Sequence, residues 1–463
     1  MPLHAGAAEI DISPTFGIQI AGDIGKIRSV KEIRDPLYAK ALVLESGRRK
    51  VVILSLDIAV IGTERAHAIR DAVAAKIGTT RDAVLLHVTQ NHSAPALGHC
   101  FTSKETPYFF PDHKWLACAD DDYYPIALAG ILEAVERANG NLEPVTVGAA
   151  SGIEARVAFN RRFVMRDGSA VMHPHPGDPR IRHSEGPIDP EVGVVRFRNA
   201  EGEDIAVLLH YTCHPTHGYP QEYISADWPG TWADGVKELL GGKVVPLVLN
   251  GCCGNIHHQN HLDPHFVNDQ NRMGMMLTET TRGALERIEC GDVETLSSES
   301  RTIQAPWRAL DPQAVADAQA MLAAFPEPKW SNAEHTQVDW AWVYAVSTID
   351  LAEQMRSKPG YDYEILTIRI GDIALVGLPG EPFVEGQLAI KLASPTYPTY
   401  VAHMSNQYAG YIPTAKALER GGYETHTSNW SKLGPAALDE IVAATGEMLR
   451  GSFGDGGSRP PGL

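Results

Sequence analysis

The sequence predicts an α/β protein with a mixed central sheet flanked by helices, organised as a single large domain with insertions. Short runs of branched apolar residues alternate along the chain with longer segments of helical periodicity. Most of these runs contain no alternating polar residues, which is typical of strands covered on both faces. A chain of 463 residues, of which 44% are hydrophobic, can bury a large core without disulfides.

Strands are expected where branched apolar residues gather between polar residues and glycines. These segments are 51–56, 83–88, 192–197, 205–209, 244–249 and 373–376. Helices are expected where Ala, Ile, Leu and Val recur at helical spacing. These segments are 63–77, 122–139, 228–240, 271–288, 311–325 and 435–449.

One catalytic domain is predicted over residues 1–453, with a tryptophan-rich helical insertion at about 301–360. Residues 454–463 are rich in Gly and Pro and predict a disordered tail. Residues 162–187 contain many His, Pro, Gly and Arg residues and few apolar ones, which predicts a long loop of the kind that often carries function.

Composition excludes several classes of protein. The formal net charge of −17 argues against a dedicated nucleic-acid binder and against an anionic membrane surface as partner. The chain contains no run of about 18 apolar residues, so no integral membrane segment is expected, and the first residues do not resemble a secretory signal. The six cysteines form no C-x-x-C pair. We therefore expect a cytoplasmic protein with a small-molecule substrate. Whether it forms a homo-oligomer is left open by the sequence.

Polar clusters follow five of the apolar runs, at the point where each strand would end. They are the segments 89–95, 210–217, 250–258, 379–382 and 405–411. Ligands bind beyond the carboxyl ends of strands in open α/β sheets, so strands that run the same way would bring these clusters to one pocket. His92, His214 and Glu381 lie in these clusters and are candidate site residues.

Several histidines leave two interpretations open, a polar surface segment and a site, and for His173 and His175 the pattern favours the surface. These histidines are His173, His175, His257, His258, His261 and His265. Imidazole, carboxylate and phenolate groups from separate segments would suit zinc. The chain contains no H-E-x-x-H helix, no phosphate-binding G-x-x-x-x-G-K-[ST] loop and no G-x-S-x-G elbow, which argues against those common designs.

At these clusters the chain resembles the neutral/alkaline non-lysosomal ceramidases, specifically their N-terminal catalytic domain. The likeness extends from AEIDISP at 8–14 to Tyr423 and Glu424, and it leaves no residues for the Ig-like C-terminal domain of true ceramidases. The resemblance implies an α/β catalytic domain of a distant bacterial relative, and amide hydrolysis at a zinc centre.

The resemblance also implies a ligand set of two histidines, a glutamate and a tyrosine. CHPT at 213–216 points to His214, GEPF at 380–383 to Glu381, and NQYAGY at 406–411 to Tyr411. The first histidine of the family's THTHSGP motif aligns with Gln90 in TQNHSAP at 89–95, and His92 matches the second.

Gln90 is a departure with chemical consequences, because an amide oxygen is a poorer zinc ligand than imidazole. Three outcomes are open. Zinc binds more weakly through Gln90 or a water, His92 becomes a ligand, or the metal is absent.

Catalytic roles follow from the same resemblance. His92 is expected to act as general acid/base, and Arg161 or Tyr411 to stabilise an oxyanion. If the metal is absent, His257 is expected to contribute acid/base chemistry together with His92 and His214. Substrate contacts are expected from Asn91, Asn255, Asp227 and Tyr423.

The sequence thus predicts a metal-dependent hydrolase that cleaves an amide or related polar linkage. Arg161 and the basic, His-rich stretch 162–187 favour a small polar substrate, such as a carboxylated compound, over ceramide. Two alternatives remain: a metal-free acid/base enzyme acting on a carbohydrate-like substrate, and a non-catalytic ligand-binding relative.

Overall fold

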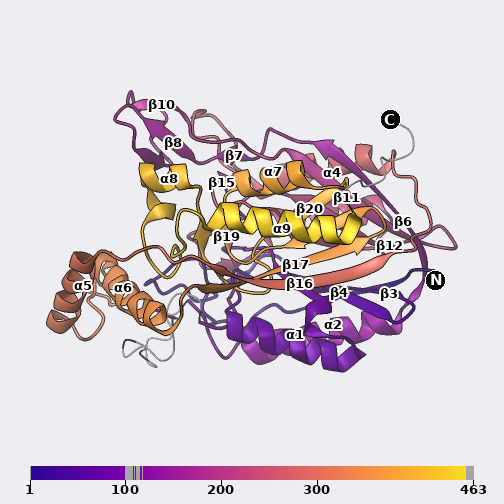
Figure 1. Ribbon diagram of the computed structural model, residues 1–463, viewed down its shortest axis with the longest axis horizontal. Helices are drawn as coiled ribbons and strands as arrows, with labels where there is room; N and C mark the ends of the chain where they lie inside the picture. Colours follow the sequence, from indigo (N-terminus) through magenta and orange to yellow (C-terminus); the bar gives the residue numbers. More distant parts are fainter. Residues whose placement is uncertain (1, 100–107, 109, 111–114, 117, 455–463) are drawn as a thin grey trace.

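The computed structural model describes residues 2–99, 108, 110, 115–116 and 118–454. An eight-stranded mixed sheet has the order β14-β12-β11-β6-β1-β3-β4-β5 (Figure 1). Its strands are β1 (His4–Asp11), β3 (Tyr38–Ser46), β4 (Arg49–Leu56), β5 (Val84–Val88), β6 (Glu143–Ile153), β11 (Glu191–Asn199), β12 (Asp204–Tyr211) and β14 (Val245–Asn250). The pairs β4–β5 and β12–β14 are parallel, and the other neighbours in this sheet are antiparallel.

A second sheet of four strands packs against the first. Its order is β16-β17-β18-β20, with β16 (Leu296–Ala305), β17 (Tyr361–Ile370), β18 (Ile373–Gly377) and β20 (Thr399–Ala402). One apolar core joins the two sheets, since Leu44 and Ile53 of the larger sheet belong to the same buried cluster as Ile368 and Leu375 of the smaller one.

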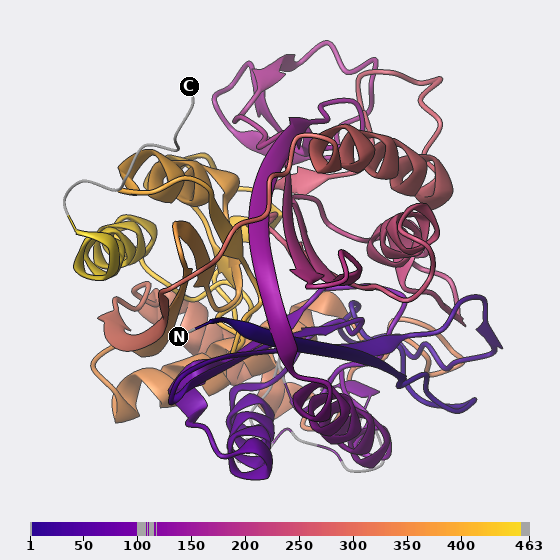
Figure 2. The ribbon, with the colours of Figure 1, turned by 90° about the vertical axis from the view of Figure 1, so that its right-hand side faces the viewer.

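Helices cover the outer faces of both sheets, which gives four layers (Figure 2). The covering helices are α1 (Thr63–Ile77), α2 (Tyr124–Gly140), α3 (Asp227–Leu239), α4 (Gln270–Leu285), α7 (Val384–Ala393) and α9 (Ala437–Phe453). The pair α1 and α2 shares a core with β3, β4 and β5, the pair α3 and α4 shares one with β11, β12 and β14, and α7 and α9 share one with the smaller sheet. Among the described residues, no helix combines the length and apolar character that crossing a membrane requires.

The predicted fold class is confirmed, and each predicted strand and helix overlaps an observed element. The apolar runs are indeed covered on both faces. On one face, however, the cover is the second sheet and not a layer of helices, because Leu44 and Ile53 face the smaller sheet while Val43 and Val52 face the helices.

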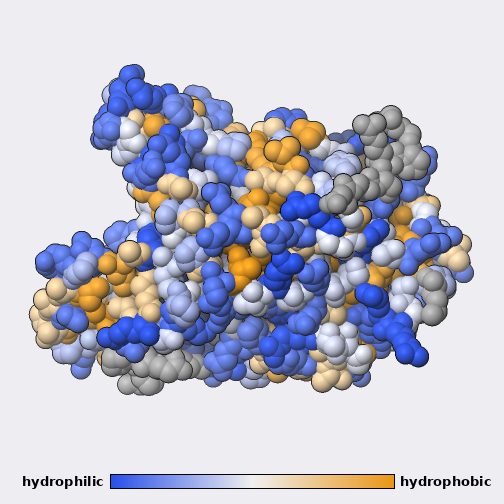
Figure 3. All heavy atoms as spheres, viewed as in Figure 1, coloured by the Kyte–Doolittle hydropathy of each residue, from blue (hydrophilic) through white to orange (hydrophobic). Residues whose placement is uncertain are grey.

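A helix pair lies between β16 and β17 and projects from the body of the molecule (Figure 1). It consists of α5 (Pro312–Ala324) and α6 (Trp340–Ser357), within the insertion predicted at about 301–360. Figure 3 shows apolar residues among polar ones over this pair. The end of β16 occupies the first residues of that predicted range. Of the predicted disordered tail, residues 455–463 lie outside the described residues.

The prediction of a long loop at 162–187 is wrong. This stretch forms a three-stranded antiparallel sheet of β8 (Arg162–Met165), β9 (Ala170–Met172) and β10 (Ile181–Ser184). Phe163 and Val164 are buried, and the guanidinium of Arg162 is buried through ion pairs with Glu185 and Glu424. A buried, fully paired arginine can therefore occupy a strand that composition alone presents as polar.

The strand ends meet around Asn250, the last residue of β14. Its backbone N–H donates to Nε2 of His87 in β5 at 3.0 Å, so the two edges of the eight-stranded sheet approach each other. Its side-chain amide donates to the carbonyl oxygens of Thr89 and Cys213, both at 3.0 Å. Asn250 thereby joins the polar segments that follow β5, β12 and β14.

Candidate active site

A cavity of about 520 Å³ opens where the strand ends meet. Its wall includes many of the residues predicted from the sequence, drawn from all five strand-end clusters and from two further segments. They are Gln90, His92, Arg161, His214, His257, Glu381, Tyr411 and Tyr423. The convergence expected from the strand-end clusters is therefore present in the geometry, whereas their chemical roles remain predictions.

His214 and Glu381 face each other at the inner wall of this cavity. Nδ1 of His214 lies 2.7 Å from the carbonyl oxygen of Cys253, which can only accept, so Nδ1 carries the proton and Nε2 has the lone pair. That Nε2 lies 3.3 Å from Oε2 of Glu381, and within the described part of the chain neither atom has a hydrogen-bond partner. Two buried acceptors at this distance repel each other unless a cation or a proton lies between them.

Tyr411 is held beside this pair by the short strands β19 (Glu381–Pro382) and β21 (Tyr411–Ile412). These strands are parallel and pair Glu381 directly with Tyr411. Burial and the neighbouring Glu381 raise the pKa of the Tyr411 phenol well above its usual value. Arg161 donates to the phenol oxygen through Nη2 at 3.3 Å.

Arg161 itself is held in place from behind. Its Nε donates to Oε1 of Glu424 at 2.8 Å, and its Nη2 also donates to the carbonyl of Gly254 at 2.8 Å. Arg162 Nη1 donates to the other carboxylate oxygen of Glu424 at 2.7 Å. Although burial raises the pKa of Glu424, the two guanidinium groups hold it below its usual value, so this carboxylate stays charged.

Gln90, which the resemblance aligns with the family's first histidine, lines the cavity. Its backbone φ is +65°, in the left-handed region that costs a non-glycine residue about 1–3 kcal/mol. Its side-chain oxygen accepts a weak hydrogen bond from the thiol of Cys253 at 3.5 Å. The amide of Gln90 therefore lies close to the carbonyl that orients His214.

His92 lines the same cavity as Glu381. Its ring centroid is 5.6 Å from that of His214 and 6.2 Å from that of Tyr219. Gly22 packs directly against this ring, since a Cβ at that position would lie 2.5 Å from Nδ1 of His92. Burial is the largest cause that lowers the pKa of His92 well below its ordinary value, and the positive charge of Arg28 acts in the same direction. The imidazole is therefore neutral at neutral pH and able to accept a proton.

Three of the predicted substrate-binding residues do not line the cavity. Their side chains form hydrogen bonds to other groups of the protein instead. Asn91 donates to the carbonyl of Ser225 and accepts from the N–H of Ser93. Asn255 accepts from the N–H of Val384 and donates to Glu385. Asp227 is fully buried and accepts from His217. A polar residue after a strand can point behind the wall as well as into it.

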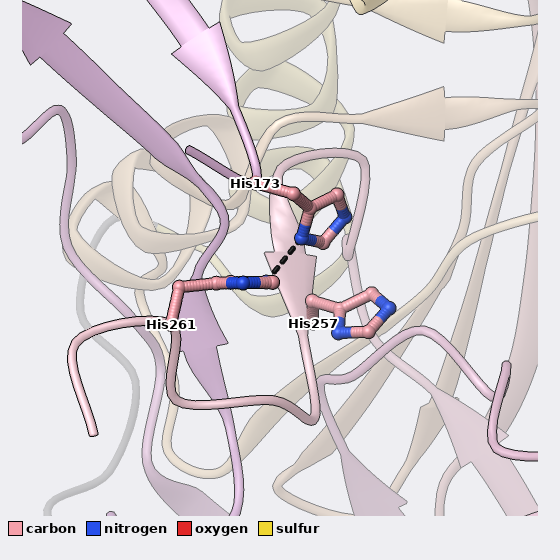
Figure 4. A group of neighbouring side chains, drawn as sticks. All are labelled: His173, His257 and His261. Carbon is pink, nitrogen blue, oxygen red and sulfur yellow. Dashed lines mark hydrogen bonds between the residues drawn. The ribbon is translucent and has the colours of Figure 1, made fainter. Parts of the chain in front are cut away.

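Three histidines come together at a second place on the cavity wall (Figure 4). His173 follows β9, His257 ends the short strand β15 (Ile256–His257), and His261 lies in the segment after it. One ring nitrogen of each lies within 4.8 Å of the others. Burial and then Arg161 lower the pKa of His173 to about 2 and that of His261 to about 4, so both rings are neutral.

Residues 4–239, slightly more than half of the chain, match the family described as neutral/alkaline non-lysosomal ceramidase, N-terminal. The chain belongs to this family. The resemblance inferred from the strand-end motifs is thereby confirmed. Ceramidases are hydrolases that act on an amide bond, and this ceramidase-family protein is a hydrolase of that kind.

Two solved structures share the fold of this ceramidase-family protein. One is titled "Crystal Structure Analysis of neutral ceramidase from Pseudomonas aeruginosa", with a TM-score of 0.71 and 18% sequence identity, covering 100% of this chain and 76% of that one. The other, "Ceramidase complexed with C2", also has a TM-score of 0.71 and 18% identity and covers 100% and 77%. At this level of identity the likeness establishes the architecture.

Sequence reasoning on this ceramidase-family chain missed several residues of the cavity. His217 lines the wall and is held by Asp227, whose Oδ1 lies 2.7 Å from His217 Nδ1. Tyr408 donates to Glu381 Oε1 at 3.3 Å. His217 was three residues from His214 in HPTH, and Tyr408 was in NQYAGY, so both could have been found. Glu424 carries no local pattern that marks it as the partner of Arg161.

The arginines that suggested recognition of a carboxylated substrate are largely paired within the protein. Arg161 and Arg162 share Glu424, and Arg180 pairs with Asp178 at 2.7 Å. The polar groups that remain on the cavity wall of this ceramidase-family protein are mainly imidazoles.

Proposed function

We propose that this protein is a zinc-dependent amide hydrolase acting on a small polar N-acyl compound in preference to ceramide. The observation that carries the proposal is the facing pair of His214 Nε2 and Glu381 Oε2, which lie 3.3 Å apart. Both residues are almost fully buried, and a cation is the simplest group that satisfies both atoms at once.

The donor set around this pair fits zinc. His214 offers an imidazole nitrogen, Glu381 a carboxylate oxygen and Tyr411 a phenolic oxygen, all of which are ligand types that zinc accepts. The carbonyl of Cys253 orients the ring of His214, as carbonyl groups commonly orient metal-binding histidines. Gln90 lies on the same wall and is the weaker fourth candidate. A bound zinc ion would lower the pKa of a bound water and polarise the substrate carbonyl.

The proton transfers are assigned to His92. A neutral imidazole can take a proton from the attacking water and deliver it to the departing amine, which is the role of a general acid/base in amide cleavage. The low pKa of His92 keeps the ring in its basic form before the reaction.

We assign to Tyr411 and Arg161 the stabilisation of the negative charge that develops on the substrate oxygen. The guanidinium of Arg161 contacts the phenol oxygen of Tyr411, so positive charge reaches the cavity through that contact. Glu424 fixes Arg161 from behind and is a positioning residue. We assign substrate contact to Tyr423, and support of the wall to Asn91, Asn255 and Asp227.

The preference for a polar substrate rests on the size and lining of the cavity. A volume of about 520 Å³ is in the range that suits small molecules. Imidazoles, Asp23, Gln259 and Asn268 line it together with aromatic rings. Ceramide carries two long hydrocarbon chains. If these chains filled the cavity, its polar groups would lose their hydrogen bonds to water without gaining new ones, which is unfavourable. We assign residues 1–453 to one catalytic domain, because both sheets contribute to this cavity.

Turnover of a substrate panel tests this function. The panel contains N-acetyl amino acids, N-acyl amino sugars and a short-chain ceramide, each assayed for release of the free amine. We expect the polar amides to be cleaved, the ceramide to be cleaved much more slowly, and the Glu381→Gln chain to lose at least about 100-fold in kcat/KM. Glu440→Gln on the exposed face of α9 is the matched control. Rapid ceramide cleavage would overturn the substrate assignment, and full activity of Glu381→Gln would overturn the site.

A metal-free acid/base enzyme acting on a carbohydrate-like substrate is the second candidate, and the observation that favours it is Gln90 at the place of a histidine ligand. In that case His92→Ala abolishes turnover while chelation of metals has no effect. A chain that binds such ligands but turns over none of them would instead be a non-catalytic relative.

A further inference from the structure

We propose that His173, His257 and His261 form a second metal site, which binds a divalent transition-metal ion such as zinc on the cavity wall. One ring nitrogen of each residue lies within 4.8 Å of the others. The three residues reach this place from separate segments, after β9, at the end of β15 and in the segment that follows β15. Figure 4 shows His173 and His261 pointing toward each other beside His257.

A direct contact between His173 and His261 is the first argument. Nδ1 of His173 and Nε2 of His261 lie in close contact. Each neutral ring carries its proton on one nitrogen only, so the tautomers in which both contacting nitrogens present lone pairs are accessible. If the two rings move apart to admit a metal ion, the ion would accept both lone pairs, with His257 as the third ligand.

Hydrogen bonds around His257 supply the second argument, because they define its tautomer. Nδ1 of His258 lies 2.5 Å from the side-chain oxygen of Asn268, so it donates, and Nε2 of His258 accepts from the Thr216 hydroxyl at 2.8 Å. Thr216 Oγ1 must then accept from Nε2 of His257 at 2.9 Å. Nδ1 of His257 is left with its lone pair, which receives only the backbone N–H of Gln259 at 3.1 Å.

That pattern is typical of a metal-binding histidine. The nitrogen that does not bind metal donates to an oxygen, which fixes the orientation of the ring. A metal on Nδ1 of His257 would replace the contact with the Gln259 N–H. The acid/base role that the sequence predicted for His257 then becomes the role of a ligand.

The chemistry of the donors selects the class of metal. No Asp, Glu or Cys of the described residues joins the three histidines. A site of three imidazoles favours zinc, copper or nickel over calcium and magnesium, which prefer oxygen ligands. Zinc bound by three histidines also keeps a fourth position open, and here that position would face the cavity.

This site is separate from the pair of His214 and Glu381. The lone pair of His214 is directed toward Glu381, since its other nitrogen contacts the Cys253 carbonyl. The two sites are neighbours along the backbone, because His214 and His257 form an isolated β-bridge. The inference therefore stands whether or not the proposed hydrolytic zinc is present.

Zinc titration of the full chain tests the inference. The protein is freed of metal by chelation and dialysis, and zinc chloride is titrated by calorimetry, with cobalt absorption as an independent signal. The Glu381→Gln background removes the inner pair, so we expect one equivalent of zinc to remain. Adding His261→Asn should weaken that equivalent at least about 100-fold. His265→Asn is the matched control, because His265 is an exposed histidine in the same segment, and it should change nothing.

His173→Asn is a second variant of the same site, in case the His261→Asn chain does not fold. Thermal unfolding shows whether each variant is folded. Zinc binding by the Glu381→Gln chain that is unchanged after His261→Asn and His173→Asn would overturn the second site. Absence of any zinc binding in the Glu381→Gln chain would overturn it as well. Neither result bears on amide turnover by the wild-type chain, which is measured separately.

Discussion

Nε of Arg161 lies 2.8 Å from Oε1 of Glu424, and both side chains are buried. Glu424 also binds Arg162, so a single carboxylate holds one guanidinium against Tyr411 and another inside β8. Through these two arginines, Glu424 connects the 3-10 turn at 423–425 with the start of β8. The position of Arg161 in the cavity wall therefore depends on a residue more than two hundred positions away in the sequence.

Replacing Glu424 by Gln should destabilise the fold. Two buried guanidinium groups would lose their charged partner, and breaking a buried ion pair in this way costs about 3–5 kcal/mol. Chemical denaturation measures the loss. Glu419→Gln, which breaks an exposed ion pair with Lys416, is the control and should leave the midpoint unchanged within error. Equal midpoints for the two variants would contradict the assigned role of Glu424.

Gly22→Ala should impair turnover through His92. The new Cβ would lie 2.5 Å from Nδ1 of His92, so the ring must move. Gly17→Ala is a matched control, because both glycines have a φ of +89° but the Cβ at position 17 meets no atom within 4 Å. Both variants should lose about 1–2 kcal/mol of stability from backbone strain. Only Gly22→Ala should lower kcat, by at least about tenfold. Similar kcat values for the two chains would argue against a catalytic His92.

Stability should fall with acid in the range where His87 is neutral only in the folded chain. Nδ1 of His87 donates to the carbonyl of His403, and Nε2 accepts from the N–H of Asn250, so no site is left for a second proton. Burial lowers the pKa of His87 to about 3, whereas in the unfolded chain a histidine pKa is about 6.5. Between these values the unfolded state binds the extra proton, so stability decreases as the pH falls.

His87→Gln isolates this contribution. The free energy of unfolding is measured by denaturant at several values from pH 7 to pH 4. The wild-type chain should be the more stable at pH 7, and its advantage should shrink by about 1.4 kcal/mol per pH unit below about pH 6.5. Parallel curves for the two proteins would show that His87 does not titrate in this way.

Gln90→His should strengthen zinc binding at the inner site. An imidazole replaces an amide oxygen beside His214, and histidine tolerates the left-handed backbone of this position better than most residues do. We expect affinity to rise at least about tenfold in a competition assay with a chromogenic chelator. The His261→Asn background removes the second proposed site from the measurement. An unchanged affinity would mean that position 90 does not face the metal.

The fold was largely predictable because strands that are buried on both faces consist of continuous runs of apolar residues. Val51 to Leu56 has few polar residues and lies between two covered faces, as expected. The nature of the second cover was not predictable, since a run such as 373–376 looks the same under helices as under another sheet. The strands at 162–184 were missed because the burial of Arg162 depends on Glu424, which lies far along the chain.

The residues of the candidate site were predictable where the end of a strand determines which residues reach the cavity. They were less predictable where the direction of a side chain decides whether it faces the cavity. His92, His214 and Glu381 follow strands and reach the cavity. Asn91 adjoins His92 in the sequence, but its side chain hydrogen-bonds to the carbonyl of Ser225. The cluster of His173 with His261 depends on packing between β9 and the segment after β15, which no local spacing encodes.

Removal and return of zinc, followed by one assay of amide cleavage, tests the central claim most directly. The wild-type chain is stripped with a chelator, dialysed and assayed on the best polar amide of the panel, then assayed again as zinc is added back. We predict that stripping abolishes cleavage, that zinc restores it in the wild-type chain, and that zinc restores none in the His214→Ala chain. Full cleavage by stripped protein with no measurable zinc would contradict the account.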